Sequence, residues 1–164
     1  MNPNDRQIGE CMTEQTLIAT VGSEPQVVTL VLDLLFDKGY PITKVMVVHT
    51  CGKDVRDALK ALSVEMGALQ PISFEKIGVI HEHRPVTDNL THEDAGAFLR
   101  TIYQVVLKEK RAGRVVHLSI AGGRKTMAVY GMVAAQSQNQ PGACTSAFAA
   151  LKASRLTCSF EQRR

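Results

Sequence analysis

The sequence predicts one α/β domain with a doubly wound, Rossmann-like parallel sheet flanked by helices. Two observations predict this fold class. Short apolar runs rich in valine and isoleucine alternate with longer segments whose apolar residues recur at the spacing of a helix buried on one side. Glycines, prolines or polar turns mark the junctions. This alternation of strand and helix favours parallel strands joined by right-handed crossovers.

The length of 164 residues, with 45% hydrophobic and 21% charged residues, is typical of one globular domain. We place this domain at residues 15–140. Residues 1–14 are polar and lack an apolar period, which predicts a flexible N-terminal segment. Residues 141–164 break the alternation: 147–151 suit a helix and 155–160 a short edge strand, but a loop suits both equally well. The sequence leaves the structure of this divergent C-terminal segment open.

The first strand–helix unit begins directly after the N-terminal segment. Residues 16–21 are a short apolar run with β-branched side chains, which suits a strand buried on both faces of a parallel sheet. Pro25 lies where a first helical residue would, and apolar side chains then repeat at helical spacing until Gly39, a typical helix end. The unit therefore predicts a strand, a loop and a helix.

The next elements repeat this pattern. Residues 44–49 are the second predicted strand, and residues 54–66 are a helix that Gly67 closes. Residues 76–80 are the third predicted strand.

A long helix and a last strand–helix unit complete the domain. Thr91, with Asp94 three residues later, resembles a capping box and predicts the start of a helix that ends before Gly113. Residues 114–120 are the fourth predicted strand. After a glycine turn, residues 125–138 are the last predicted helix.

Composition and charge exclude several classes of partner. The formal net charge of +3 comes without a basic stripe, so binding of double-stranded nucleic acid is not predicted, whereas a small anion is easily accommodated. The cysteines have no CxxC spacing and no secretory leader is recognised, which predicts reduced thiols in a cytoplasmic protein. The apolar runs are shorter than the roughly 18 to 20 residues of a membrane span. We expect no membrane association, and no metal or other cofactor.

Two loops have the composition of a ligand site. In a doubly wound sheet, ligands bind beyond the carboxyl ends of the strands, where helix N-termini favour anions. The first loop, residues 20–25, offers Gly22 and the hydroxyl of Ser23. The second loop, residues 120–126, has two glycines that allow close approach of the backbone. They are followed by two cations and a hydroxyl, so that the second loop contributes Ala121, Gly122, Gly123, Arg124, Lys125 and Thr126.

The second loop is the stronger signal. Cations at the start of a helix oppose its dipole by roughly 0.3 to 1 kcal/mol, so Arg124 and Lys125 predict an anionic partner. The alternative is a glycine turn with two solvated basic residues. The loop is not a Walker A motif, because that motif needs glycine directly before its lysine, where this chain has Arg124. We therefore predict a phosphate-bearing ligand, with ATP hydrolysis disfavoured.

Other candidate residues carry weaker signals. Ser23 suits a helix N-cap, a ligand contact or both, and Glu24 suits a first-turn charge that the helix dipole favours. His81 and His83 alternate as two metal ligands would, but no third ligand has supporting spacing, so a solvated loop is the preferred interpretation. His117 lies within a predicted strand and is expected to be a packed or surface residue. No GxGxxG follows the first strand, and no GxSxG elbow is present.

Taken together, these segments resemble a known family. The first loop, Val48-His49-Thr50, Thr87-Asp88-Asn89 and, above all, Ser119-Ile120-Ala121-Gly122-Gly123-Arg124-Lys125-Thr126-Met127 are similar to CRISPR-associated Rossmann-fold (CARF) proteins. The closest resemblance is to the small ring nucleases of this family. It covers about residues 16–135. Family members usually continue into a further strand and an acidic, aromatic segment, and residues 141–164, which are rich in alanine, serine and arginine, do not match them.

The resemblance implies a homodimer that binds a cyclic oligoadenylate, usually the tetra-adenylate, across its two-fold axis. Without a metal, a ribose 2′-hydroxyl would attack the adjacent 3′-phosphate and release linear products ending in a 2′,3′-cyclic phosphate, which switches off type III CRISPR signalling. The alternative within the family is a sensor that binds the ring and cleaves it slowly or not at all. An unrelated nucleotide-binding Rossmann protein is a more distant alternative.

The resemblance also implies roles for individual residues. Lys125 would stabilise the charge of the phosphorane, Ser23 would help to hold an in-line geometry, and Arg124 would contact a phosphate or act as a structural cation. The residues implied to bind the ring are Gly22, Thr50, Asp88, Asn89, Ala121, Gly122, Gly123 and Thr126.

Overall fold

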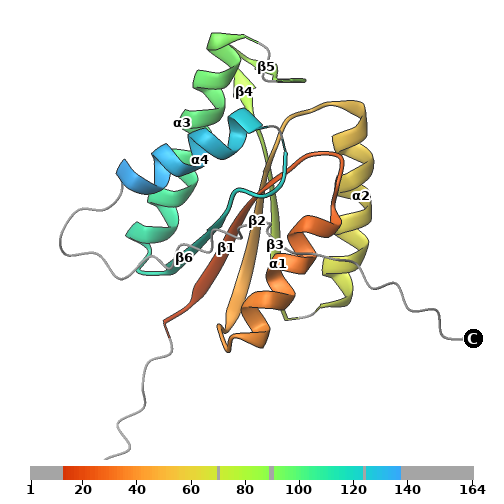
Figure 1. Cartoon of the computed structure of the whole chain (residues 1–164), viewed down its shortest axis with the longest axis vertical. Coiled ribbons are helices and arrows are strands. Elements are labelled where there is room, and N and C mark those ends of the chain that lie inside the picture. The colour runs from red at the N-terminus through yellow and green to blue at the C-terminus, as the bar shows by residue number, and fades with distance from the viewer. Residues whose placement is uncertain (1–12, 70, 89–90, 124, 138–164) are drawn as a thin grey trace, which may run out of the picture.

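Parallel strands form the centre of the molecule. The computed structural model describes residues 13–69, 71–88, 91–123 and 125–137. Within them, four parallel strands form a sheet in the order β3-β2-β1-β6 (Figure 1). These strands are β1 (Gln15–Val21), β2 (Ile42–His49), β3 (Ser73–Gly78) and β6 (Val115–Ser119). The predicted α/β class with a parallel sheet is confirmed.

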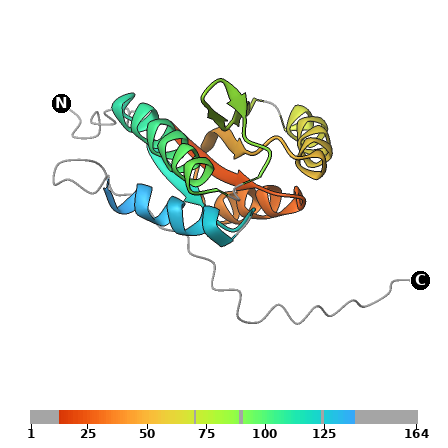
Figure 2. The same ribbon diagram turned by 90° about the horizontal axis from the view of Figure 1, so that it is seen from above.

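Helices cover both faces of this sheet (Figure 2). In the described residues, α1 and α2 pack on one face, and α3 and α4 pack on the other. Their bounds are Gln26–Asp37, Lys53–Ala68, His92–Arg111 and Lys125–Ser137, respectively. Along β1, Leu17 belongs to the core under α1 and α2 and Ile18 to the other core, because successive side chains of a strand alternate. The apolar run of β1 is therefore buried on both faces, as predicted.

The strand order creates a topological switch point next to β1. The chain runs outward from β1 to β2 and β3 through α1 and α2, and then returns through α3 to β6 on the other side of β1 (Figure 1). The loops after β1 and β6 therefore leave the sheet side by side, at the edge where the parallel strands end. We call this the carboxyl edge, and in doubly wound folds it is where ligands bind.

Local signals in the sequence fix two helix ends. Gly39 follows α1 with a φ of +80°, and its N–H donates to the carbonyl of Phe36 at 2.8 Å, an arrangement that glycine accommodates without strain. At the start of α3, the Thr91 hydroxyl accepts a hydrogen bond from the N–H of Asp94 at 3.1 Å. Both predicted helix boundaries are confirmed.

Two predicted boundaries are wrong. Gly67 does not close α2, which runs through it to Ala68, because a glycine inside a helix costs only about 1 kcal/mol and tertiary packing overrides that cost. The third strand is β3 and ends at Gly78, whereas Ile80 belongs to a short antiparallel hairpin. This hairpin consists of β4 (Ile80–His81) and β5 (Arg84–Pro85).

The predictions for the two ends of the chain fall largely outside the described residues. Residues 1–12 carry most of the predicted flexible N-terminal segment, and residues 138–164 carry the whole divergent C-terminal segment. Both therefore stay predictions. Among the helices of the described part, none combines the length and apolar character that crossing a membrane requires.

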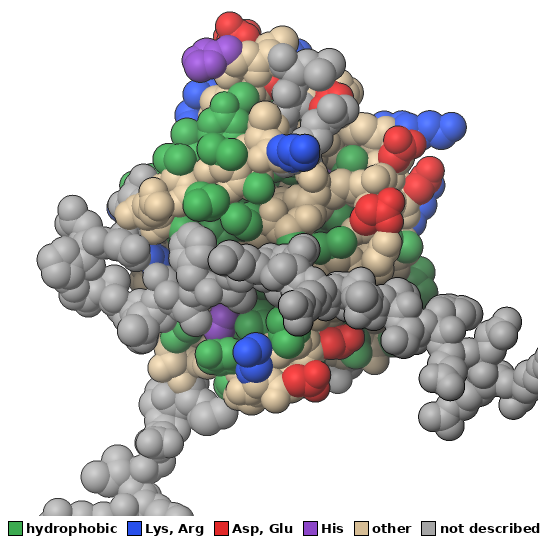
Figure 3. Space-filling model, viewed as in Figure 1, with side chains coloured by type: hydrophobic (Ala, Val, Ile, Leu, Met, Phe, Trp, Pro, Cys, Tyr) green, Lys and Arg blue, Asp and Glu red, His purple; other side chains and the backbone are tan. Residues whose placement is uncertain are grey.

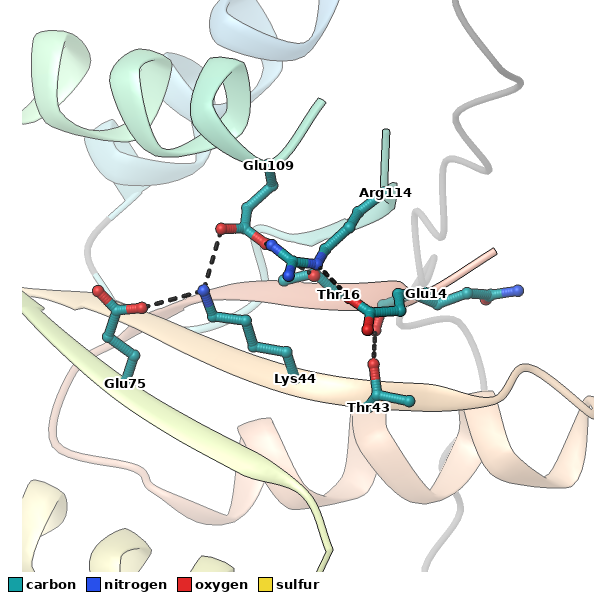
Figure 4. A network of polar contacts seen from close by, with 8 residues as sticks. Glu14, Thr16, Thr43, Lys44, Glu75, Glu109 and Arg114 are labelled. Atoms are coloured by element: carbon teal, nitrogen blue, oxygen red, sulfur yellow. Dashed lines mark hydrogen bonds and ion pairs between the residues drawn. The ribbon is translucent and has the colours of Figure 1, made fainter. Parts of the chain in front are cut away.

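A polar network holds the opposite end of the sheet, which we call the amino edge because the strands begin there (Figure 4). The side chain of Glu109 in α3 is fully buried and accepts hydrogen bonds from Thr16 at 3.0 Å, Lys44 at 3.0 Å and Arg114 at 3.1 Å. Burial opposes the charge of Glu109, but these partners outweigh it and lower its pKa. The network ties the end of α3 to β1, to β2 and to the residue that precedes β6.

Candidate functional site

A cleft of about 430 Å³ opens at the carboxyl edge of the sheet. The loops that follow β1, β2 and β6 line it, together with the segment between β5 and α3. We call it the carboxyl-edge cleft. It brings together seven of the residues that the sequence singled out as ligand contacts or catalytic groups, namely Gly22, Ser23, Thr50, Asp88, Ala121, Gly122 and Gly123.

The glycines of the two loops pack backbone against backbone. A Cβ atom on Gly22 would lie 2.9 Å from the Cα of Gly123, and one on Gly122 would lie closer than 3.0 Å to the carbonyl oxygen of Thr20. The Thr20 hydroxyl also donates a hydrogen bond to the Gly122 carbonyl. Gly123 has a φ of +92°, a conformation that favours glycine. Contact with β1 therefore requires these glycines, in addition to any contact with a ligand.

Ser23 does not cap α1. The N-cap of that helix is Pro25, without a side-chain hydrogen bond, so the N-cap interpretation of Ser23 is wrong. Within the described residues the exposed Ser23 hydroxyl makes no hydrogen bond, and the residue lines the carboxyl-edge cleft. Its hydroxyl is thus available to a molecule bound there.

Glu24 also differs from its predicted role. It precedes the N-cap, and the first turn of α1 contains no acidic residue, so Glu24 is not a first-turn charge. Pro25 takes the N-cap position, so Glu24 lies two residues before Gln26, the first residue of the helix. Its carboxylate accepts a hydrogen bond from the side chain of Gln26 and lines the cleft.

The segment between β5 and α3 forms a further wall of the cleft. Thr87 and Asp88 line the cleft there, and the segment is held by the N–H of Cys51, which donates to the Val86 carbonyl at 2.7 Å. The preceding hairpin is fixed to α3 by an ion pair of 2.7 Å between Arg84 and the buried carboxylate of Asp94. The position of Asp88 thus depends on contacts with both the loop after β2 and α3.

Lys125, the basic residue of the second loop that the structure describes, does not line the cleft. Lys125 and Thr126 are the first two residues of α4 and are exposed, but neither is among the lining residues. Arg124 and Asn89 lie outside the described residues. The structure therefore brings the glycines of the loop to the cleft and leaves Lys125 beside it.

The sequence analysis missed two charged lining residues. Lys53 and Asp54 form the start of α2 and line the cleft. Their position directly beyond the carboxyl end of β2 is the signal that could have found them, because it is the same position that drew attention to the loops after β1 and β6. Among the described lining residues, Lys53 is the one cation, beside the carboxylates of Glu24, Asp54 and Asp88.

The histidines lie outside this cleft. His81 faces Asp94, with 3.7 Å between Nδ1 and the carboxylate, and His83 lies in the hairpin turn with a φ of +67°. In the part of the chain that the structure describes, no three His, Cys, Asp or Glu side chains come close enough to hold a metal ion. His117 is buried and bonds to Gln15 at 2.8 Å, and burial lowers its pKa. The expectation of a packed residue is confirmed for His117.

Comparison with known proteins shows the family of this chain. Residues 24–145 match the profile of the family described as CRISPR-associated protein NE0113. The match begins one residue after Ser23 and extends ten residues beyond position 135, where the resemblance read from the sequence ends.

The chain is also 30% identical over 122 residues to the CRISPR system ring nuclease SSO2081 of Saccharolobus solfataricus. The aligned region covers 74% of this chain and 65% of that relative. The chain thus spans just under two thirds of the length of the protein that it matches.

Proposed function

This chain belongs to the CRISPR-associated NE0113 family, and from that premise we propose that it is a ring nuclease, an enzyme that binds a cyclic oligoadenylate in the carboxyl-edge cleft and cleaves it. One observation carries the proposal. The loops after β1 and β6 meet backbone to backbone at the switch point of the sheet, in a domain 30% identical to a protein named as a ring nuclease. Cleavage in the cytoplasm would then switch off type III CRISPR signalling.

We propose that the ligand is cyclic tetra-adenylate, shared by two subunits. A cleft of about 430 Å³ lies in the lower part of the range of about 300 to 1,000 Å³ that suits drug-sized ligands, so it holds only part of a ring of four nucleotides. Two clefts related by a two-fold axis would enclose a ring that has the same symmetry. The size and the symmetry of the ligand therefore favour a homodimer.

The outer face of α4 supports this dimer. Val129 is 58% exposed and Met132 42% exposed on a helix that is apolar around most of its circumference. Figure 3 shows hydrophobic side chains gathered over the part of the molecule where α4 runs. A helix with apolar residues on every side is usually buried, and α4 starts at the carboxyl-edge cleft. A partner seated on α4 would thus bring a second cleft close to the first.

The proposed reaction needs no metal. A ribose 2′-hydroxyl attacks the adjacent phosphorus, the bond from phosphorus to the 5′-oxygen breaks, and the proton passes from the 2′-oxygen to the leaving 5′-oxygen. The products are a 2′,3′-cyclic phosphate and a 5′-hydroxyl. Ser23, which lines the cleft and whose hydroxyl makes no hydrogen bond to any described residue, holds the ribose or phosphate in line, and Lys125 stabilises the phosphorane. Arg124 contacts a phosphate. Positioning and electrostatics then supply the rate.

The remaining residues bind the ring around this centre. The backbone of Gly22, Gly122 and Gly123 approaches the phosphates, and Ala121 and Thr126 flank it. Thr50, Asp88 and Asn89 contact the adenine and the ribose. The carboxylate of Asp88 favours this side, because it accepts hydrogen bonds from amino and hydroxyl groups but repels a phosphate.

A second candidate function is a sensor that binds the ring without cleaving it. One observation favours it: Lys125, the proposed catalytic cation, does not line the cleft of its own chain. For cleavage, Lys125 must therefore reach the ring where the two clefts of a dimer face one another.

One assay separates the two functions. Purified protein is incubated with cyclic tetra-adenylate in excess chelator, and the products are followed by mass spectrometry. We expect linear products with a 2′,3′-cyclic phosphate. Lys125→Ala should lose most of the cleavage and Ser23→Ala part of it. If the protein retains the intact ring at one ring per dimer and forms no linear product, the protein is a sensor. Absence of binding would exclude both functions.

A further inference from the structure

We propose that Lys53, the first residue of α2, is a phosphate-binding residue of the carboxyl-edge cleft. Lys53 would hold the ring on the β2 side of β1, while the second loop, residues 120–126, holds it on the β6 side. The assignment rests on the proposed function and adds a binding residue that no motif in the sequence predicts.

Topology places Lys53 and the glycines of the second loop on opposite sides of β1. In the sheet order, β1 separates β2 from β6. Lys53 follows β2 by four positions, whereas Arg124 and Lys125 follow β6. A ring that spans the cleft would therefore meet the ammonium group of Lys53 on one side of β1 and the backbone of Gly122 and Gly123 on the other.

Charge balance in the cleft restricts how a ring can lie. Among the described lining residues, the carboxylates of Glu24, Asp54 and Asp88 outnumber the single ammonium group of Lys53. A cyclic oligoadenylate carries one negative charge per nucleotide, and like charges at short range repel. The charges favour an orientation with a phosphate turned toward Lys53 and with the sugars and bases turned toward the carboxylates.

The described lysines differ in how they are paired. Lys44 is bound to Glu75 and Glu109, and Lys60 to Asp57. Lys53 makes no ion pair with any described residue, although three carboxylates line the same cleft. Its charge is not used to hold the fold, and it is accessible to an anion.

The assignment also gives Lys53 and Lys125 different roles. Lys53 lines the cleft and would contact a phosphate throughout binding, which contributes to affinity in the ground state and in the transition state alike. Lys125 lies beside the cleft and would act on the scissile phosphate. Removal of Lys53 should thus weaken binding, whereas removal of Lys125 should slow the chemical step.

Equilibrium binding tests the assignment. The probe is cyclic tetra-adenylate with 2′-fluoro riboses, which lacks the nucleophile and cannot be cleaved. For Lys53→Ala we expect a Kd about tenfold higher than that of the wild type, the loss of one charge-assisted hydrogen bond. The slope of log K against log salt should become shallower by about 0.7, the value for one phosphate contact with a single strand. Lys53→Arg should bind within about twofold of the wild type, because it keeps the charge.

Lys60→Ala is the matched control, because Lys60 lies on the same helix and is exposed. With the natural ring, Lys53→Ala should raise KM and leave kcat within about twofold. A Kd and a salt slope equal to those of Lys60→Ala, beside a wild type that binds tightly, would overturn the role of Lys53 and leave the proposed function intact. A wild type that does not bind the ring would overturn both.

Discussion

The two edges of the sheet use polar side chains in opposite ways. At the amino edge, the buried Glu109 is paired with Thr16, Lys44 and Arg114 at 3.0 to 3.1 Å. At the carboxyl edge, Ser23 and Lys53 face a cleft of about 430 Å³ without a hydrogen bond or ion pair to any described residue. A buried charge without partners is costly, so the first arrangement serves the fold. The second leaves polar groups available to a ligand.

Glycine marks the second difference between the edges. The amino edge is closed by long side chains that reach one another across strands (Figure 4). The carboxyl edge is built where two backbones touch, at Gly22 and Gly123. Changes at the first edge should therefore reduce stability, and changes at the second should reduce ring binding and cleavage.

The largest expected effect is on stability, for Glu109→Ala. Removing one member of a buried ion pair typically costs about 3 to 5 kcal/mol, and we expect about 3 kcal/mol because Lys44 and Arg114 keep contacts with Glu75 and Glu14. Urea unfolding measures this free energy. Glu75→Ala, which removes a carboxylate 42% exposed from the same lysine, should cost less than about 1 kcal/mol. Ring cleavage by the folded Glu109→Ala protein should equal that of the wild type, and a large loss would contradict the division between the edges.

Gly122→Ala should have a similar effect, but on cleavage. The added methyl group would lie closer than 3.0 Å to the Thr20 carbonyl, so the second loop must move, and a shift of about 1 Å in a catalytic site can cost about a hundredfold in rate. Rates with cyclic tetra-adenylate measure it. Gly67→Ala is the control, because nothing lies within 4 Å of its Cβ position. It should keep full activity and gain up to about 1 kcal/mol of stability. Equal rates for the two variants would place the reaction elsewhere.

Ser23→Ala should lower the cleavage rate without lowering stability. Because its hydroxyl makes no hydrogen bond to described residues, the free energy of unfolding should change by less than about 0.5 kcal/mol. The cleavage rate should fall by about tenfold, which is the loss expected when one positioning hydrogen bond is removed. Thermal melting and single-turnover kinetics test both parts. A variant that is destabilised but fully active would reverse our assignment of this residue.

The smallest expected effect concerns pH. Burial lowers the pKa of His117 below its ordinary 6.5, so the neutral form favours the folded state, and this contribution is lost as the pH falls below 6.5. The pKa of Glu109 is lowered below 4.5, so its contribution is lost only as the pH falls below 4.5. In unfolding titrations, His117→Phe should flatten the decline that begins at pH 6.5 and leave the more acidic decline unchanged. An unchanged profile would show that His117 does not titrate on unfolding.

The sequence predicts what is local. The strand buried on both faces, the helix end at Gly39 and the cap at Thr91 depend on neighbours within a few residues, and each is confirmed. The second loop could be found because cations at the start of a helix oppose its dipole, which predicts an anionic ligand. The position of the cleft followed from the rule that doubly wound sheets bind ligands at the carboxyl edge.

Long-range pairing could not be predicted in the same way. Glu109 lies 93 residues from Thr16 and 65 from Lys44, and nothing in the local pattern of α3 distinguishes it from a solvated charge. Lys53 precedes the apolar period of α2, and a lysine at the start of a helix does not by itself show that it lines a cleft. Ser23 was assigned a possible N-cap because serine suits one, whereas Pro25 takes that position. These errors arise where tertiary structure chooses between local alternatives.

The central claim is that the carboxyl-edge cleft binds half of a cyclic oligoadenylate. Isothermal titration calorimetry of the wild-type protein with 2′-fluoro cyclic tetra-adenylate tests it most directly, because it gives affinity and stoichiometry together. We predict saturation at one ring per two chains. Saturation at one ring per chain, or the absence of binding, would contradict the claim.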